Sequence, residues 1–164
     1  MPLGKRILIL GAGNKPSGNA VNHDITKHRP EIDIAWDLND LPWPWGDSMF
    51  DSITAWAVLE HLYHDVLRSM NEIWRIGAPG CIANIKLPYW RSEVSHNDLT
   101  HHWFVGLNCF DQLDPSTRRG SEYAFYTPCE WTILSCALNK GGTSALNKGG
   151  TSVLAKLKSL KGAK

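Results

Sequence analysis

The chain has 164 residues, of which 43% are hydrophobic and 20% are charged, and its formal net charge is +1. This length suits a single domain with a sizeable core, so we expect one domain over residues 1–164. The near-neutral charge gives no electrostatic reason to expect nucleic acid or a membrane surface as a partner. No apolar run is long enough to span a bilayer.

The four cysteines are widely spaced and form no Cys-x-x-Cys pair, which disfavours a zinc site of the usual spacing. No signal peptide is visible at the N-terminus. Reduced and mostly buried thiols are typical of the cytoplasm, so we expect a cytoplasmic protein.

The most informative segment is an apolar run that leads directly into a Gly-x-Gly turn. Ile7–Leu10 predicts a buried strand, and Gly11 and Gly13 follow it. Glycine permits positive φ and a close approach of the backbone to a ligand. A second short strand, residues 20–25, contains Asp24 near its end, and a carboxylate there can accept hydrogen bonds from a ribose diol. The layout predicts a nucleoside site, although a proline replaces the third glycine of the dinucleotide pattern.

The following segments alternate between strand and helix patterns. Further strands are expected over residues 32–36, 50–57 and 81–87. Apolar residues at helical spacing predict one helix over residues 64–76, which Gly77 and Pro79 would end. Residues 91–128 lack a clear period and are interpreted as a long excursion beside an active site. This order of elements favours an α/β protein with a largely parallel sheet.

The C-terminal part contains an identical tandem octapeptide, ALNKGGTS, at residues 137–144 and 145–152. With one copy removed, the sequence predicts a strand, a glycine-containing turn and a second strand over residues 151–157. We therefore expect the fold to end in an antiparallel hairpin. The second copy would be surplus and would lengthen the hairpin loop.

The order and spacing of six sequence blocks resemble those of class I S-adenosylmethionine-dependent methyltransferases, in a compact form with a shortened first crossover. The blocks are residues 10–16, 21–25, 37–43, 50–53, 58–62 and 71–80. The resemblance is good over residues 5–90 and looser beyond them. It implies S-adenosylmethionine as cofactor and an α/β fold: a Rossmann-like, mostly parallel seven-stranded sheet in a three-layer α/β/α arrangement, with a C-terminal antiparallel hairpin.

The resemblance also implies roles for residues at the first two strand ends. Gly11 and Gly13 would pass under the methionine part of the cofactor. Asp24 would bind the ribose hydroxyls.

The next two strand ends complete the implied cofactor site. Asp37 would accept a hydrogen bond from the adenine amino group, and the backbone N–H of Leu38 would meet a ring nitrogen. The end of the fourth strand, near Trp56 and Ala57, would face the methionine amino group. Trp43 and Trp45 either stack on an aromatic ligand or pack their loop onto the sheet, and packing is the favoured interpretation.

Catalytic residues are less well specified, because methyl transfer from a sulfonium needs little beyond orientation and a base for a protonated nucleophile. The candidates are His61, His101 and Tyr89. Histidine can act as a base near neutral pH, but each of these side chains can also serve only in local hydrogen bonding.

The acceptor is expected to be a small molecule, or one that the sequence does not identify. No Asp/Asn-Pro-Pro-Tyr/Phe element follows the fourth strand, which argues against amino-methylation of DNA. One alternative is a module that binds the cofactor or a nucleoside without transferring a methyl group. Another is a metal hydrolase, but its ligand spacing is loose, so no metal is expected. The hydrolase would use Glu60, His61, His96, Asp98, His101 and His102.

Overall fold

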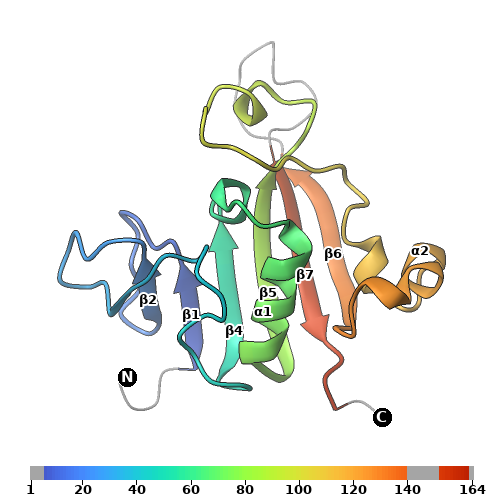
Figure 1. Ribbon diagram of the computed structural model, residues 1–164, viewed down its shortest axis with the longest axis horizontal. Coiled ribbons are helices and arrows are strands. Elements are labelled where there is room, and N and C mark those ends of the chain that lie inside the picture. Colours follow the sequence, from blue (N-terminus) through green and yellow to red (C-terminus); the bar gives the residue numbers. More distant parts are fainter. Residues whose placement is uncertain (1–5, 140–151, 163–164) are drawn as a thin grey trace.

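The structure is a computed structural model that describes residues 6–139 and 152–162. Within these residues one seven-stranded sheet has the order β3-β2-β1-β4-β5-β7-β6 (Figure 1). Strand β7 is antiparallel to both of its neighbours, and the other strand pairs are parallel. The Rossmann-like, mostly parallel sheet with a terminal antiparallel hairpin is thus confirmed. The strands are β1 (Ile7–Leu10), β2 (Val21–Asp24), β3 (Ile34–Ala35), β4 (Phe50–Trp56), β5 (Gly77–Pro88), β6 (Trp131–Asn139) and β7 (Ser152–Ser159).

Helix α1, Val66–Ile76, is the main helix and connects β4 to β5. It begins after Asp65, whose side chain caps it by accepting a hydrogen bond from the backbone N–H of Arg68 at 2.8 Å. The helix ends at Gly77, as expected. Gly77 is also the first residue of β5, where it pairs with Phe50 of β4. The shorter helices are η1 (Leu59–His61), η2 (Glu93–Ser95), η3 (Asp111–Leu113), α2 (Arg118–Glu122) and η4 (Ala124–Tyr126).

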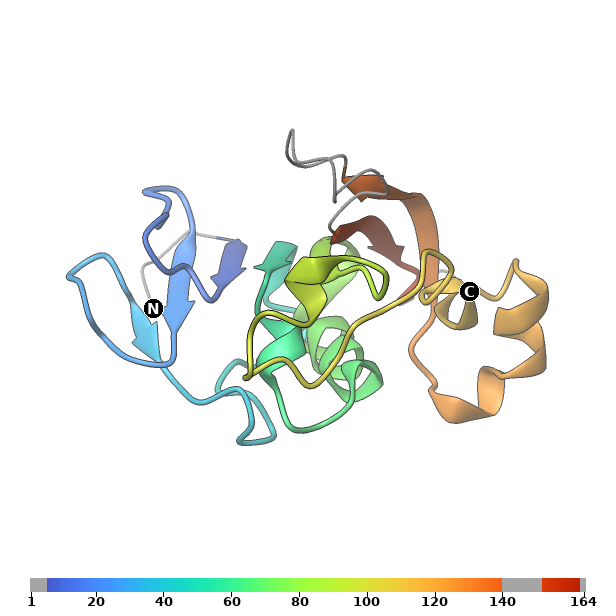
Figure 2. The ribbon, with the colours of Figure 1, turned by 90° about the horizontal axis from the view of Figure 1, so that it is seen from above.

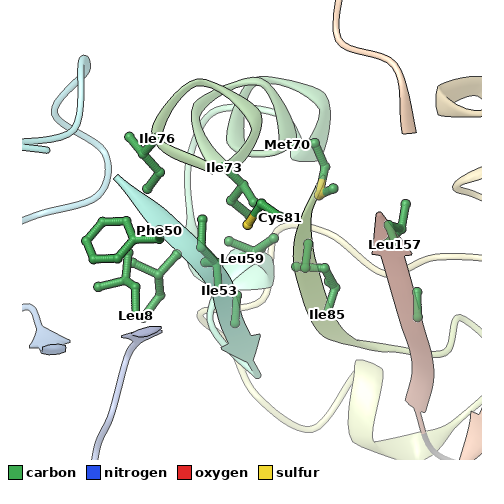
Figure 3. Packing of buried hydrophobic residues seen from close by; sticks show 14 of the residues in the cluster. Leu8, Phe50, Ile53, Leu59, Met70, Ile73, Ile76, Cys81, Ile85 and Leu157 are labelled. Atoms are coloured by element: carbon green, nitrogen blue, oxygen red, sulfur yellow. The ribbon is translucent and has the colours of Figure 1, made fainter. Parts of the chain in front are cut away.

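The hydrophobic core lies between α1 and one face of the sheet (Figure 3). Met70, Ile73 and Ile76 of the helix are almost fully buried, and they meet Ile53 and Ile85 from the central strands. Burial of one such side chain contributes roughly 1.5–3 kcal/mol. The apolar stripe of α1 therefore holds the helix on the sheet. None of the described helices has the length and apolar character needed to cross a membrane.

The opposite face of the sheet is more open. Lys156 and Lys158 of β7 are exposed and alternate with buried neighbours, because successive side chains of a strand point to opposite faces. Figure 2 shows α1 on one side of the sheet, and the described residues form no helix on the other. The crossovers at residues 11–20 and 25–33 are loops. They leave the third layer of the expected α/β/α arrangement unformed within residues 6–139 and 152–162.

The terminal hairpin pairs β6 and β7 from Trp131 opposite Ser159 to Asn139 opposite Ser152. Strand β7 ends at Ser159, two residues beyond the expected end at residue 157. Most of the tandem octapeptide falls in residues 140–151, outside the described residues, so the surplus copy stays a prediction.

Candidate functional site

A cavity of about 320 Å³ opens at the carboxyl ends of the parallel strands. Ligands of open α/β sheets bind at this edge, because the loops that leave the strands meet there. The volume is at the lower end of the range for small-molecule pockets. The cavity brings together four of the six expected cofactor residues. It is lined by Gly11, His23, Asp24, Ile25, Trp36, Asp37, Leu38, Asn39, Ala57, Val58, His61 and Leu62.

The Gly-x-Gly turn depends on glycine at both positions. Gly11 has φ of +59° and Gly13 has φ of +52°, values in the left-handed region that favours glycine. A Cβ atom on Gly11 would lie only 2.3 Å from Cγ2 of Val58. The absence of a side chain therefore allows the turn after β1 to pack directly against the end of β4.

Asp24 connects the second strand to this turn. Its Oδ2 accepts a hydrogen bond from the backbone N–H of Gly13 at 2.7 Å, and its Oδ1 accepts one from the N–H of Ile25 at 2.8 Å. Gly13 does not line the cavity itself but positions the carboxylate that does. Since each carboxylate oxygen has two lone pairs, Asp24 retains capacity for a ligand.

His23 is a site residue that the sequence interpretation missed. It is buried, and its Nε2 donates to the backbone oxygen of Trp36 at 2.9 Å, while its Nδ1 accepts from the N–H of Gly11 at 3.4 Å. Burial lowers the pKa of His23, which keeps the imidazole neutral as these bonds require. The sequence signal that could have identified His23 is the presence of a polar residue within a short buried strand.

The segment after β3 is held by polar contacts of its own. Asp37 Oδ1 accepts from both the backbone N–H and the side-chain amide of Asn39, at 2.9 Å each. The backbone oxygen of Leu38 accepts from Trp43 Nε1 at 2.9 Å and from His64 Nε2 at 3.0 Å. Among the described residues, Asp37 Oδ2 and the Leu38 N–H form no hydrogen bond, so both are available to a ligand.

The tryptophans divide into packed and accessible side chains. Trp43 and Trp45 are each 2% exposed, so they pack their loop onto the sheet and are not open to stacking. Trp45 also contacts the edge of the His23 ring at 5.4 Å between centroids. Trp36 lines the cavity and is 36% exposed.

Trp56 is not brought to the cavity. It is 59% exposed and lies on the face of β4 opposite the buried Ala55, because side chains alternate along the strand. The positions that line the cavity are the next two, Ala57 and Val58. Ala57 has φ of +56°, and this turn of the backbone redirects the chain toward the cavity.

Beyond the expected cofactor residues, three side chains form what we call the Glu–His–His cluster: Glu60, His61 and His101. Glu60 and His61 belong to η1, and His101 comes from the excursion after β5. The two segments are joined because the Glu60 backbone oxygen accepts from the N–H of His102 at 2.7 Å. The His61 and His101 rings lie edge to face, 4.8 Å between centroids.

The hydrogen bonds around both imidazoles indicate their tautomers. The Thr100 hydroxyl donates to Asp98 Oδ1 at 2.6 Å, so its oxygen accepts from His61 Nδ1 at 2.8 Å. His101 Nδ1 lies 3.3 Å from the Ser95 backbone oxygen, which can only accept. We therefore assign the proton to Nδ1 and the lone pair to Nε2 in both rings. Burial, with a smaller effect of the neighbouring His101, lowers the pKa of His61.

The other catalytic candidate is separate from the cavity. Tyr89 packs against the core and pairs with Val105 in an isolated bridge, and it is absent from the cavity lining. His96 Nε2 bonds the backbone oxygen of Trp90, and the ring of His102 packs on Tyr63. Of the three candidates, His61 and His101 are brought together and Tyr89 is not.

No family model matches the chain, and no curated protein matches it in sequence. Solved structures match it over most of its length. One is an S-adenosylmethionine-dependent methyltransferase from Mesorhizobium loti, with a TM-score of 0.62, 11% identity, and coverage of 93% of this chain and 90% of that one. Another, from Methanosarcina mazei, has a TM-score of 0.59 and 17% identity, over 94% and 92% of the two chains. A third, from Archaeoglobus fulgidus, has a TM-score of 0.56 and 15% identity, over 94% and 86%.

Proposed function

We propose that this chain, which has the fold of class I S-adenosylmethionine-dependent methyltransferases, binds S-adenosylmethionine and transfers its methyl group to a small molecule. One observation carries the proposal. Gly11, Asp24, Asp37 and Leu38 leave three different strand ends and line a single cavity. These are four of the six positions at which the resemblance implies contacts to methionine, ribose and adenine.

The residues present fit this cofactor. The Gly11 turn has no side chain to obstruct a ligand, and Val58 closes the space behind it. Asp24 has acceptor capacity for a ribose diol. Asp37 Oδ2 can accept from an exocyclic amino group, and the Leu38 N–H can donate to a ring nitrogen. The apolar surfaces of Ile25 and Trp36, both in the lining, suit the flat faces of adenine.

The chain's own contribution to transfer would be orientation and proton removal. S-adenosylmethionine supplies, when bound, a methyl group on a positively charged sulfur. His61 lines the same cavity, and its unprotonated Nε2 is suited to accept a proton from an acceptor. His101 lies against it as a second candidate base. Tyr89 would act only if the acceptor reached beyond the cavity.

The cysteines support a cytoplasmic location as part of this proposal. All four are unpaired, and burial raises the pKa of Cys81 and of Cys109 to about 12. Such thiols are unreactive and are compatible with a reducing compartment. The near-neutral chain charge agrees with a small-molecule acceptor rather than nucleic acid.

Calorimetric titration with S-adenosylmethionine and with S-adenosylhomocysteine tests the proposal directly. We expect both to bind in the micromolar range, with one molecule per chain. A folded protein that binds neither would refute the cofactor assignment. Incubation with methyl-labelled cofactor and a metabolite extract then tests transfer, and binding without any labelled product would identify a non-catalytic binding module instead.

A further inference from the structure

The Glu–His–His cluster contains a polar atom that nothing in the described residues satisfies. Glu60 is 2% exposed, and its Oε2 has no hydrogen-bond partner. No Lys or Arg nitrogen of the described residues forms an ion pair with it. Buried carboxylates are normally hydrogen-bonded, paired with a cation or bound to a metal. The position of Glu60 is therefore explained if a cation binds there.

Two imidazoles lie next to this carboxylate. One ligand atom from each of Glu60, His61 and His101 lies within 4.8 Å of the other two. With ligand bonds of about 2.0–2.1 Å and tetrahedral geometry, two ligand atoms of one zinc ion lie about 3.3–3.4 Å apart. Side-chain rotations that bring the three atoms closer by roughly 1–1.5 Å would thus allow all three to bind one ion.

The outer hydrogen bonds also suit metal binding. Histidines that bind a metal through one nitrogen almost always donate the N–H of the other to a carboxylate, carbonyl or other acceptor, which orients the ring. His61 Nδ1 donates to Thr100, which is itself bonded to Asp98, and His101 Nδ1 faces the Ser95 carbonyl. The Nε2 lone pair of each ring is consequently available to an ion, and His101 Nε2 also lies 3.9 Å from Asp98 Oδ2, beyond hydrogen-bond distance.

From this geometry we infer that Glu60, His61 and His101 form a binding site for a divalent transition-metal ion, with zinc as the best fit. Two imidazoles and one carboxylate are a common zinc ligand set, and such a set keeps at least one coordination position open. His61 also lines the cavity at the carboxyl ends of the parallel strands, so the ion would lie at the edge of that cavity.

This site goes beyond the proposed methyl transfer and does not depend on it. A bound ion would occupy the Nε2 lone pairs that the base role of the two histidines requires. With the ion in place, His61 and His101 would be ligands and not bases. An oxygen-bearing ligand in the cavity could then fill the open coordination position.

Zinc titration of chelator-treated full-length protein, followed by calorimetry, is the test. We expect one zinc ion per chain with a micromolar or lower Kd. Glu60→Gln and His101→Ala should each weaken zinc binding at least tenfold, because each removes one of three ligands. The matched controls are His96→Ala and His102→Ala, neighbouring histidines outside the cluster, and these should leave the zinc Kd within about twofold of wild type.

A second measurement on the wild type keeps the inference falsifiable if a variant fails to fold. Side-chain nitrogen NMR of the histidines should show zinc-dependent shifts at Nε2 of two rings and none at their Nδ1. The near-ultraviolet spectrum of the cobalt-substituted protein should lack a thiolate charge-transfer band. Absence of zinc binding by folded wild type, binding unaffected by both cluster variants, or a cobalt–thiolate band would overturn the site. S-adenosylmethionine binding, measured in parallel, separates this failure from failure of the proposed function.

Discussion

The cofactor end of the cavity (Gly11, Asp24, Asp37 and Leu38) and the Glu–His–His cluster are stabilised in different ways. At the cofactor end, the two carboxylates accept hydrogen bonds from residues nearby in sequence, as Asp37 does from Asn39 and Asp24 does from Gly13 and Ile25. In the cluster, Glu60 and His101 are 41 positions apart (101 minus 60), and one oxygen of Glu60 has no hydrogen-bond partner among residues 6–139 and 152–162.

The difference indicates which part of the site is preorganised by the chain alone. Short-range hydrogen bonds hold the cofactor end in place before a ligand arrives. The Glu–His–His cluster depends on a contact between two distant segments, and among the described residues Glu60 Oε2 has no hydrogen-bond partner. Substitutions at the cofactor end should therefore affect ligand binding and folding together, whereas substitutions in the cluster should leave the fold largely intact.

The largest effect is expected for Gly11→Ala. The new methyl group would meet Val58 and would impose a positive φ on alanine, so the turn after β1 must move. We expect at least a 100-fold loss of S-adenosylmethionine affinity and a lower Tm, measured by calorimetry and thermal unfolding. Gly18→Ala is the control, because no atom lies within 4 Å of its added Cβ. Equal S-adenosylmethionine affinities and equal Tm values of the two variants would contradict the role of the Gly-x-Gly turn.

Asp24→Asn should have the next largest effect. It preserves the shape of the side chain but removes the charge and one acceptor, at a cost of roughly 1.5–3 kcal/mol for hydrogen bonds to a charged group. The expected result is a 10- to 100-fold weaker affinity for S-adenosylhomocysteine with a nearly native circular dichroism spectrum. Asp51→Asn, which alters an exposed ion pair with Arg6, should bind normally. Unchanged affinity in the Asp24 variant would remove the ribose assignment.

The lowered pKa of His23 predicts that the free energy of unfolding depends on pH. Because burial lowers its folded-state pKa below the ordinary 6.5, the unfolded chain takes up a proton first as the pH falls. The free energy of unfolding should therefore decline below about pH 6.5, by at most about 1.4 kcal/mol per pH unit for this group. Urea titrations between pH 5 and pH 8 should show a weaker decline in His23→Gln. The pKa of His61 is also lowered, so the contribution of His23 is the difference between the pH dependence of wild type and that of His23→Gln.

Thr100→Val should have the smallest effect on stability. It removes the acceptor for His61 Nδ1 in an exposed part of the chain, which costs about 1 kcal/mol or less. S-adenosylmethionine affinity should stay within about threefold of wild type, while zinc affinity should fall by about tenfold, because an outer partner of a metal ligand is lost. A large drop in Tm would show that the cluster and the fold are more tightly coupled than the contacts indicate.

The sequence was sufficient where function and structure are local. Ile7–Leu10 was predicted with its observed bounds, because an apolar run ending at glycine has few other interpretations. Gly11, Asp24, Asp37 and Leu38, to which the family resemblance gave cofactor roles, line one cavity at the carboxyl edge of the sheet, and their roles stay predictions. The terminal hairpin was likewise predictable, since its strands and turn residues are adjacent in sequence.

Tertiary structure decided the rest. Strand alternation and the backbone turn at Ala57 place Trp56 outside the cavity. Hydrogen bonds to the backbone of Gly11 and of Trp36 hold His23 inside the site. The Glu–His–His cluster, whose ligand spacing had argued against a metal, exists because His102 bonds the Glu60 backbone and so brings His101 to Glu60. Local patterns determine strands and turns, but contacts between distant segments require the packed fold that brings them together.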